Sequence, residues 1–514
     1  PYLNVDAGTM NPTEHGEVFV LDSGLECDQD MGNYERFMDL SLRNEDYVTS
    51  GMVYQYVIEK ERNLGYKGRC VEAIPHIRDE IMRRIRRAAE LNGSNISLIE
   101  IGGTIGDYQN AMFIEAARVL KLNNPEDVIF IMISYVPIPG KLGEMKTRPT
   151  QNAVRALNSY GVQPNIIIAR SERPLDKKRK DKIAVACNIP ADAVISAPDI
   201  DSIYDVPVNF EKDRLGEIIL EELEIKRSGG SNLSSWKNMI KKLRSAKKEV
   251  SVAIVGKYFD TGDFTLSDSY LSVIEAIKFS AGKLGLKAKI SWLNSKDFSA
   301  KGGSASGREK KKLAELKKYD GIIVPGGFGE TGIDGKLSVI RYAREKRVPY
   351  LGLCYGMQLA VIEYARSVAG LKKAHTTEID PATPEPVIDI MPDQKKKLAE
   401  GNYGGSMRLG SYLAVLKRGT LARKIYGKDL IEERHRHRYE INPEYVDKIA
   451  KAGMVFSGSS PDGKLKEMAE LPQKVHPFFI ASQFHPEFKA RPLSPHPLFT
   501  AFLKTASNKK KSSK

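Results

Sequence analysis

The sequence predicts an α/β protein with two consecutive parallel-sheet domains. Short apolar runs alternate with segments of helical periodicity along most of the 514 residues, and this alternation is typical of parallel sheets covered by helices. Gly, Ser and Lys dominate residues 226–249, where the alternation weakens before it starts again. A stretch of this composition contributes little to a core, so it predicts a linker between the domains.

The elements of the first domain follow from three apolar runs. The runs "ISLIEI" (96–101), "VIFIMISYVP" (128–137) and "NIIIAR" (165–170) are short and rich in β-branched residues, which predicts buried strands. The segment "HIRDEIMRRIRRAAEL" (76–91) has helical periodicity and predicts a helix between them.

The linker and the second domain are predicted in the same way. Within the linker, "LSSWKNMIKKL" (233–243) predicts one short helix. Three strands are then expected in "VSVAIVGKY" (250–258), "YDGIIVPGG" (319–327) and "VPYLGLCYG" (348–356). Residues 506–514 end the chain in lysines and serines, and they predict a disordered basic tail.

Charge and cysteine usage narrow the class of protein. The net charge of +14 comes from dispersed basic runs without interleaved aromatic residues, a pattern that favours solvated faces over nucleic-acid binding. Attraction of anionic substrates, nucleotides included, is a second interpretation. No apolar run approaches the roughly 20 residues of a membrane span. Four cysteines without paired spacing indicate reduced thiols in a cytoplasmic protein: Cys27, Cys70, Cys187 and Cys354.

Cys354 lies where a strand is expected to turn into a helix. In "PYLGLCYGMQLAVIEYA" (349–365), a short apolar strand runs through Gly352 and Gly356 into a helical pattern. Such a turn exposes a nucleophile, and the positive end of the helix favours a thiolate. By itself, a cysteine between glycines is more often a small buried residue, so the turn alone leaves both interpretations open.

Two further segments favour catalysis. The glycine-rich loop in "VPGGFGETG" (324–332) follows a predicted strand, and its backbone N–H groups are suited to hold an oxyanion. In "SQFHPEF" (482–488), His485 and Glu487 are two residues apart. In an extended segment they share one face, which predicts a base and the carboxylate that orients it.

The motifs "GLCYGMQ", "PGGFG" and "QFHPE" together resemble the class I glutamine amidotransferases. The resemblance implies that Cys354 is the nucleophile, His485 the base and Glu487 its orienting carboxylate, with Gly327 as an oxyanion donor. It also implies a glutamine pocket formed by Tyr355, Gly356, Met357, Gln358, Glu378 and Arg438. A carboxylate suits the α-ammonium of glutamine and an arginine suits its α-carboxylate. A metal cluster is the alternative for "RHRHR" (434–438), but the flanking arginines would repel a cation.

From residue 1 to about residue 505, the chain resembles one particular branch of these amidotransferases, the CTP synthase family. The segments that carry this resemblance are "NVDAGTMNPTEHGEVFVLDSG", "DMGNYERF", "EIGGTIGD", "GEMKTRPTQ", "DIDSIYDVP", "GGSMRLG" and "RHRHRYE". It implies a P-loop-type parallel-sheet synthetase domain at 1–225, a linker at 226–249 and a class I glutamine amidotransferase domain at 250–505. It also implies ATP-dependent amination of UTP to CTP through a 4-phosphorylated UTP, with ammonia from glutamine.

The resemblance implies the ligands of the synthetase domain residue by residue. Asp30 and Glu100 match magnesium positions of the family, and Glu100 also ends the predicted strand 96–101. UTP binding and overlapping CTP feedback inhibition are implied for Asp107, Tyr108, Gln109, Lys146, Thr147, Arg148, Pro149, Thr150 and Gln151. Phosphates need such cationic and hydroxyl donors.

Two positions depart from the family pattern, and one element matches its ammonia channel. Gln109 stands where many relatives have glutamate; hydrogen bonding to a base or sugar survives this change, but the loss of charge is expected to alter CTP inhibition. Glu211 stands where a UTP-binding lysine is expected, and Lys212 is the adjacent candidate. A "PxxHGxV" element implies that Pro12, His15 and Val18 line a constriction of the channel.

The start of the chain also departs from the family. Members begin with a strand, a P-loop variant, a helix and a second strand before the equivalent of "PYLNVD" (1–6), and no displaced P-loop occurs elsewhere. We therefore expect an N-terminally truncated chain that lacks the first strands and an intact ATP site. A glutaminase-only fragment with residual UTP or CTP binding is the alternative, and a non-catalytic filament-forming protein is a third interpretation. The resemblance further implies GTP as allosteric activator and a homotetramer in the full-length form.

Overall fold

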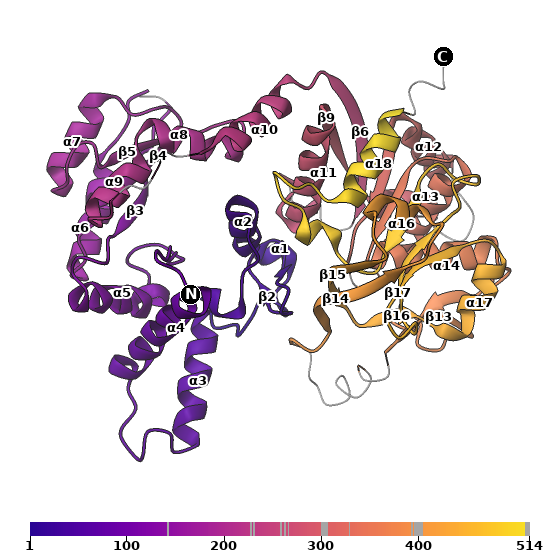
Figure 1. The fold of residues 1–514 in the computed structure, drawn as a ribbon, viewed down its shortest axis with the longest axis horizontal. Helices are drawn as coiled ribbons and strands as arrows, with labels where there is room; N and C mark the ends of the chain where they lie inside the picture. The colour runs from indigo at the N-terminus through magenta and orange to yellow at the C-terminus, as the bar shows by residue number, and fades with distance from the viewer. Residues whose placement is uncertain are drawn as a thin grey trace. The chain divides into compact units, whose positions relative to one another are not determined.

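The structure is a computed structural model. It describes the chain except residues 141–142, 227–228, 230–231, 257–259, 262–263, 266, 300–306, 328, 331, 392–393, 395–403 and 509–514. By its contacts the chain divides into two compact units (Figure 1). One comprises Pro1–Val5 and Val48–Ile240, and the other comprises Asp6–Tyr47 and Lys241–Lys514.

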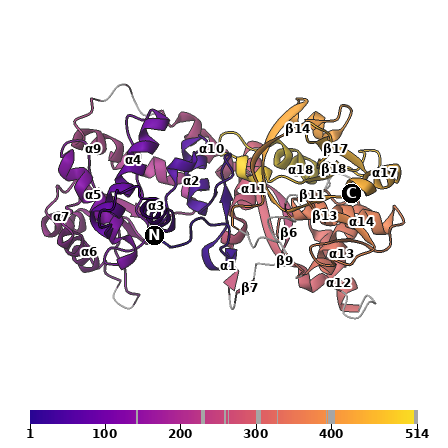
Figure 2. The same cartoon turned by 90° about the horizontal axis from the view of Figure 1, so that it is seen from below.

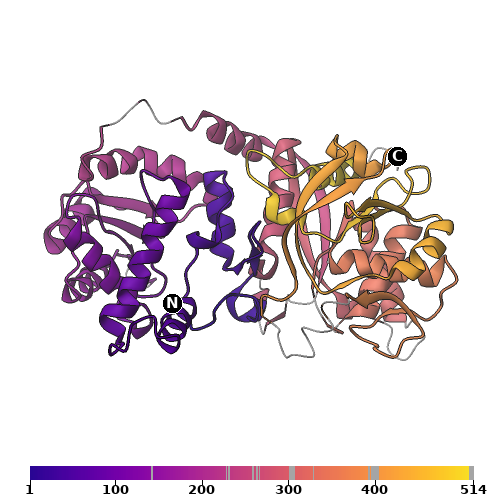
Figure 3. The ribbon, with the colours of Figure 1, turned by 60° about the horizontal axis from the view of Figure 1, so that its bottom comes forward.

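The first unit contains a parallel sheet in the order β3-β4-β5, formed by Ile131–Tyr135, Ile166–Ser171 and Val194–Pro198. On one face of β4, Ile167 and Ala169 pack with α6 (Arg148–Ser159) and α7 (Lys177–Cys187). On the other face, Ile166 and Ile168 pack with α9 (Leu215–Glu222). Figure 3 shows these helices around the sheet. Since both faces are covered, β4 has the continuous apolar sequence expected of a buried parallel strand.

A second core in this unit is helical. It is formed by α3 (Ser50–Arg62), α4 (Arg78–Asn92) and α5 (Ala111–Asn123), whose apolar faces pack together. Helix α4 confirms the helix predicted at 76–91. A short π-helical turn, Ala73–Ile77, directly precedes it and includes the first two residues of the predicted range.

The strand predicted at 96–101 is wrong. These residues form no strand, and Ile96, Leu98 and Ile99 are exposed. In the described residues, β3 has a ladder partner on one side only, β4. An apolar run becomes a strand only where its backbone finds a partner, and 96–101 has none here. Glu100 therefore lies in an exposed irregular segment rather than at the end of a buried strand.

The second unit is built on a nine-stranded sheet in the order β15-β14-β17-β18-β19-β11-β10-β6-β9. Its strands are Leu430–His437, Arg408–Leu416, Val455–Ser459, Lys466–Glu470, Phe479–Ser482, Tyr350–Leu353, Gly321–Val324, Lys248–Gly256 and Leu286–Asn294, in the same order. The five from β19 to β9 are parallel, and the remaining pairs are antiparallel. Strands β6, β10 and β11 confirm the three predicted strands.

Helices cover both faces of the parallel part of this sheet (Figure 2). Helices α13 (Ile333–Glu345) and α14 (Tyr355–Ser367) pack on one face and form the main core with β6, β10, β11 and β19. Helices α11 (Leu271–Lys283) and α18 (Pro497–Asn508) cover the other. On this face Gly321 lets Phe502 approach, since a Cβ there would lie 2.5 Å from its ring. A smaller sheet contains β12 (Ala374–Thr376), β13 (Glu385–Ile390) and β16 (Tyr439–Ile441).

Residues 6–47 belong to the second unit and form α1 (Pro12–His15), β1 (Phe19–Val20), β2 (Glu26–Cys27) and α2 (Gln29–Met38). Phe19 lies in a fully buried cluster with Phe488. The contacts therefore divide the chain differently from the predicted domain boundary, because this segment buries apolar and charged side chains against the C-terminal part.

The linker and the tail also differ in detail from expectation. Helix α10 (Ser234–Ser245) confirms the short helix predicted in the linker, and the division between the units falls within it. Strand β6 begins at Lys248, inside the predicted linker. Residues 506–508 belong to α18 and are helical rather than disordered, while 509–514 lie outside the described residues.

Candidate active site

Cys354 lies on a strained turn between β11 and α14, as the sequence predicts. It is the N-cap of α14, with φ 51° and ψ −102°, a region that residues with a side chain rarely adopt. Its backbone N–H donates to the carbonyl of Ser482 at 2.7 Å. A Cβ on Gly356 would lie 2.1 Å from the carbonyl oxygen of Val324, so glycine is required for the helix to start this close to β10.

The sulfur of Cys354 is buried but has polar neighbours. Its thiol donates to the carbonyl oxygen of Arg436 at 3.7 Å, and the side-chain amide of Gln483 donates to Sγ at 3.7 Å. Gln483 was not predicted as a site residue, although it lies in the "SQFHPEF" segment, two residues before His485. Its amide also accepts from Gln358 at 3.3 Å, which ties the predicted residue Gln358 to the cysteine.

His485 and Glu487 form the predicted pair. His485 Nδ1 lies 2.8 Å from Glu487 Oε1. His485 is the N-cap of a short 3-10 helix, Pro486–Lys489, which contains Glu487, so the segment is not extended throughout as expected. The backbone N–H of His485 donates to the carbonyl of Arg434 at 2.7 Å. Its Nε2 atom is buried and makes no hydrogen bond with the residues that the structure describes. This leaves Nε2 available for proton transfer.

The geometry brings His485, Cys354 and the glycine-rich loop together. A Cβ on Gly326 would lie 2.8 Å from His485 Cε1 and 3.7 Å from Cys354 Cβ. Burial opposes a positive charge on His485, but Glu487 and the Cys354 sulfur outweigh it and raise the pKa of His485 to about 10. The electrostatics therefore favour an imidazolium beside the sulfur at neutral pH.

Two of the predicted glutamine-pocket residues contact this loop at Gly329. Glu378 Oε1 accepts from the N–H of Gly329 at 2.7 Å, and the hydroxyl of Tyr355 donates to the Gly329 carbonyl at 3.4 Å. Burial and the charge of Glu378 raise the pKa of Tyr355. Gly327 lies in the same loop. Met357 is fully buried in α14, so it packs in the core.

Arg438 follows β15 and donates to Gln394 at 3.1 Å and to Ser406 at 2.9 Å. The adjacent Tyr439 is close enough to both Arg438 and Glu378 that, after burial, their charges shift its pKa, which is raised overall. The charges of Arg438 and Glu378 therefore both act on Tyr439.

The two histidines of "RHRHR" point into the interior. His435 Nδ1 lies 3.0 Å from His437 Nε2, and burial lowers the pKa of both. Arg408 nearby bridges the buried carboxylates Glu440 and Glu467 at 3.0 and 2.8 Å. Among the described residues, no group of three or more His, Cys, Asp or Glu is arranged to hold a metal ion.

The predicted nucleotide residues lie in the first unit, in two places. Thr147, Thr150 and Gln151 are buried at the start of α6, where Gln151 donates to the Thr147 hydroxyl at 3.2 Å. Lys146 Nζ pairs with Glu144 at 2.7 Å and is partly exposed, Arg148 is exposed, and Pro149 occupies the first turn of α6.

The second place is the turn at Asp107, whose carboxylate accepts from the N–H of Thr104 at 3.1 Å. Tyr108 is 98% exposed, and Gln109 is exposed beside it. Glu211 pairs with Lys237 at 2.5 Å, while Lys212 donates to Asn209 at 3.1 Å.

The remaining predicted residues belong to the segment 6–47, except Glu100. Asp30 is in the first turn of α2, where burial and Asp28 raise its pKa. His15 ends α1, with Nδ1 3.3 Å from Asp28 Oδ2. Pro12 begins that helix and Val18 is buried. Asp30 lies in the second unit and Glu100 in the first.

Comparisons with known proteins identify the family. Residues 1–225 match the model for the CTP synthase N-terminus, and residues 265–505 match the model for class-I glutamine amidotransferases. A CTP synthase of Thermococcus gammatolerans is 48% identical over 512 residues, which cover 99% of this chain and 92% of the relative. The chain belongs to the CTP synthase family. A CTP synthase of Methanothermobacter thermautotrophicus is 46% identical over 98% of this chain and 91% of its own length.

Membership of the CTP synthase family establishes the chemistry. The chain is a glutamine-hydrolysing ligase that converts UTP to CTP, with ATP, UTP and glutamine as substrates. The predicted synthesis of CTP from UTP is therefore supported over the alternative, a fragment with glutaminase activity only. The comparisons do not support the predicted absence of a P-loop.

Solved structures were found that cover about half of this chain. The glutaminase domain of Trypanosoma brucei CTPS with bound acivicin is 32% identical, covers 50% of this chain and 94% of its own, and has a TM-score of 0.45. A glutamine amidotransferase of Methylobacillus flagellatus is 16% identical, covers 47% of this chain and 70% of its own, with a TM-score of 0.27. Within the described residues, no helix combines the length and apolarity needed to cross a membrane.

Proposed function

We propose that Cys354, His485 and Glu487 are the catalytic triad that releases ammonia from glutamine, and that this ammonia aminates a 4-phosphorylated UTP. The observation that carries the proposal is the strained Cys354 turn beside the His485–Glu487 pair, 2.8 Å apart. A nucleophile, a base and a carboxylate that orients the base are the three parts such a hydrolysis requires.

The hydrolysis proceeds in two stages. The Cys354 thiolate attacks the δ-carbonyl carbon of glutamine, and backbone N–H donors of the Gly327 loop stabilise the oxyanion. His485 gives its Nε2 proton to the departing nitrogen, so ammonia leaves and a thioester remains. Water then attacks the thioester, His485 takes its proton, and glutamate and the thiolate are restored.

Glutamine is held by opposite charges at its two α-substituents. Glu378 binds the α-ammonium group and Arg438 the α-carboxylate. The charges of both act on Tyr439, which supports a shared pocket. Tyr355, Gly356 and Gln358 line it at the start of α14, and Met357 supports them from the core behind.

The synthetase site binds UTP through Lys146, Thr147, Arg148, Pro149, Thr150 and Gln151, and product CTP also through Asp107, Tyr108 and Gln109. The buried hydroxyls of α6 and the exposed ring of Tyr108 support this assignment. Lys212 substitutes for the lysine expected at Glu211. CTP bound here competes with UTP as a feedback inhibitor.

Asp30 and Glu100 are each candidate ligands of Mg²⁺, because carboxylate oxygens are its preferred protein ligands. The raised pKa of Asp30, caused by burial and Asp28, fits a site whose negative charge is incompletely compensated. The ion would neutralise the phosphates of ATP and UTP during phosphoryl transfer.

Three further properties complete the proposal. Pro12, His15 and Val18 line the path of ammonia, GTP activates glutamine hydrolysis, and the enzyme is a cytoplasmic homotetramer. Family membership supports all three, and the helix Pro12–His15 supports the first.

The experiment that tests the triad is Cys354→Ala, assayed with two nitrogen donors. Glutamine-dependent CTP formation should fall by about 1,000-fold or more, while ammonium-dependent formation remains, because ammonium bypasses the thiol. Glutamine hydrolysis that survives in the folded variant would remove Cys354 from the mechanism. Cys70→Ala, which changes an exposed cysteine, serves as the matched control.

A further inference from the structure

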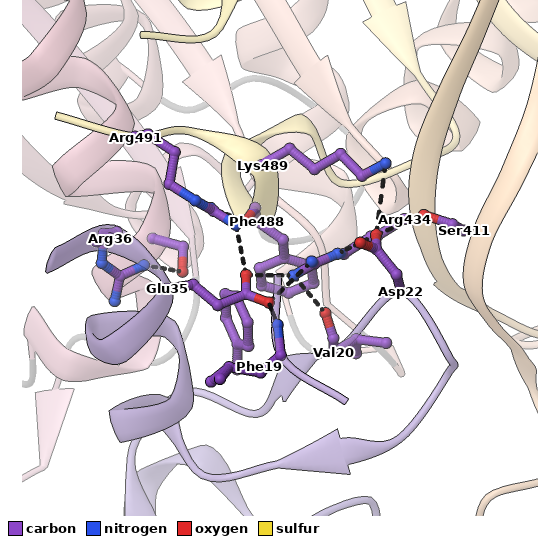
Figure 4. Close-up of polar contacts among 12 residues, drawn as sticks. Phe19, Val20, Asp22, Glu35, Arg36, Ser411, Arg434, Phe488, Lys489 and Arg491 are labelled. Carbon is purple, nitrogen blue, oxygen red and sulfur yellow. Dashed lines mark hydrogen bonds and ion pairs between the residues drawn. The ribbon is translucent and has the colours of Figure 1, made fainter. Parts of the chain in front are cut away.

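A buried ion-pair cluster joins residues 6–47 to the segment that carries the catalytic histidine (Figure 4). Glu35 of α2 and Arg434 of β15 both have fully buried side chains. Arg434 Nη1 and Nη2 donate to the two carboxylate oxygens of Glu35 at 2.8 and 3.0 Å. Arg491 Nη2 donates to the same carboxylate at 2.6 Å. Bidentate pairs of this kind are geometrically demanding.

Two further residues of the segment 6–47, Phe19 and Asp22, contact residues 485–491 or the neighbouring Arg434. Phe19 packs edge-on against Phe488 with ring centroids 5.0 Å apart, and Phe488 stacks on the ring of His485 at 5.1 Å. Asp22 pairs with Arg434 at 2.7 Å and with Lys489 at 3.4 Å. The segment 485–491 is therefore held by apolar and ionic contacts from residues 6–47.

Strand β15 connects these contacts to the catalytic atoms. Arg434 is held through its side chain by Glu35, while its carbonyl accepts from the N–H of His485 at 2.7 Å. Arg436, two residues on, is held through its side chain by Glu26 at 2.7 Å, while its carbonyl accepts from the Cys354 thiol at 3.7 Å. The same two residues thus anchor to 6–47 by their side chains and contact His485 and Cys354 by their backbones.

We propose that residues 6–47 are a positioning element of the glutaminase site, with Glu35 as its central positioning residue. The inference rests on the proposed triad and adds a requirement to it: the glutaminase depends on a segment that precedes the amidotransferase region by more than two hundred residues. Glu35 touches neither substrate nor reacting atoms, and it acts through Arg434 and Arg491.

A change at Glu35 should affect turnover more than glutamine binding. Without its carboxylate, the buried guanidinium groups of Arg434 and Arg491 lose their shared counter-ion. The carbonyl of Arg434 then no longer holds His485 in one place. The α-groups of glutamine bind at Glu378 and Arg438, which hydrogen-bond to Gly329 and Gln394. A purely structural defect would instead reduce the amount of active enzyme and expose buried thiols.

The test is Glu35→Gln, with Glu45→Gln as control because Glu45 is exposed in the same segment. Glutamine hydrolysis by the full chain is measured for kcat and KM. Since small misplacements of catalytic groups are costly, kcat should fall by about 10- to 100-fold with KM within about 3-fold of the parent. Iodoacetamide labelling, read by peptide mass, should show slower reaction of Cys354 while buried Cys27 and Cys187 stay protected.

Each outcome decides between named possibilities. Parental kcat and Cys354 labelling in folded Glu35→Gln would overturn the inference, whereas activity that survives in Cys354→Ala would overturn the triad itself. If Cys27 and Cys187 become reactive, the Glu35→Gln variant has unfolded. The inference is then tested with Phe19→Leu, which weakens the contact with Phe488 without changing a charge. Phe19→Leu should lower kcat at constant KM, and parental kcat would again overturn the inference.

Discussion

Gly326 lies directly against the imidazole of His485. A Cβ on Gly326 would lie 2.8 Å from His485 Cε1, closer than carbon atoms approach in folded proteins, and 3.7 Å from Cys354 Cβ. The glycine-rich loop can therefore lie this close to Cys354 and His485 only because Gly326 has no side chain. The position belongs to the "VPGGFG" motif, yet the sequence alone singled out its neighbour, Gly327.

Gly326→Ala should disable glutamine hydrolysis without unfolding the protein. The added methyl group displaces the His485 ring, and we expect kcat to fall by about 100-fold. Ammonium-dependent CTP formation should be retained. Gly216→Ala is the control, since nothing lies within 4 Å of a Cβ at that position. Parental glutaminase kcat in Gly326→Ala would show that the ring has room to move.

Glu487→Gln should shift the alkaline limit of glutaminase activity. Burial lowers the pKa of His485, but Glu487 and the Cys354 sulfur raise it to about 10. Loss of the Glu487 charge leaves burial less opposed, so the pKa falls toward its ordinary value. The alkaline limb of the kcat/KM profile should move to lower pH. Glu432→Gln, at an exposed position of β15, should leave the limb in place. An unmoved limb in Glu487→Gln would separate it from the ionisation of His485.

Glu17 should make stability depend on pH. Its buried carboxylate accepts from the backbone N–H of Ser272 at 3.0 Å, and burial raises its pKa from 4.5 to about 7. Because the folded-state pKa is the higher one, the contribution of Glu17 is fully present below pH 4.5 and is lost as pH rises toward 7. Between pH 5 and pH 8 the parent should lose up to about 3 kcal/mol relative to Glu17→Gln.

Urea denaturation of both proteins at the two pH values measures this difference. Glu14→Gln, which removes an exposed carboxylate three residues earlier, should track the parent at both. The prediction is wrong if the Glu17→Gln curve also tracks the parent.

Lys146→Met should weaken UTP binding and spare the glutaminase. A charge-assisted contact to phosphate is worth roughly 1.5–3 kcal/mol, so the Kd for UTP should rise by about 10- to 100-fold in equilibrium binding. Lys289→Met removes the same charge from an exposed position of β9 in the other unit and should bind UTP normally. Unchanged UTP affinity in Lys146→Met would exclude this lysine from the nucleotide site.

Local patterns were enough to predict the turn at Cys354 and many of the strands and helices around it. Gly352 and Gly356 flank Cys354 closely enough in sequence to reveal the strand–turn–helix that places its φ at 51°. The "HPE" spacing likewise predicted the His485–Glu487 contact, although Glu487 lies in a 3-10 helix that His485 caps. The hydrophobic pattern wrongly predicted a strand at 96–101. A strand forms only where its backbone groups find hydrogen-bond partners in a neighbouring strand, and the pattern of one segment does not show whether such a neighbour exists.

The sequence by itself determined the family, the triad candidates and the α/β alternation, because motifs and periodicity are written in neighbouring residues. Only the tertiary structure decided which surfaces these elements bury. Glu35 and Arg434 are 399 positions apart, and no local rule relates them. Charged side chains enter an interior only where the fold supplies a partner, so the assignment of residues 6–47 to the glutaminase unit emerged from packing alone.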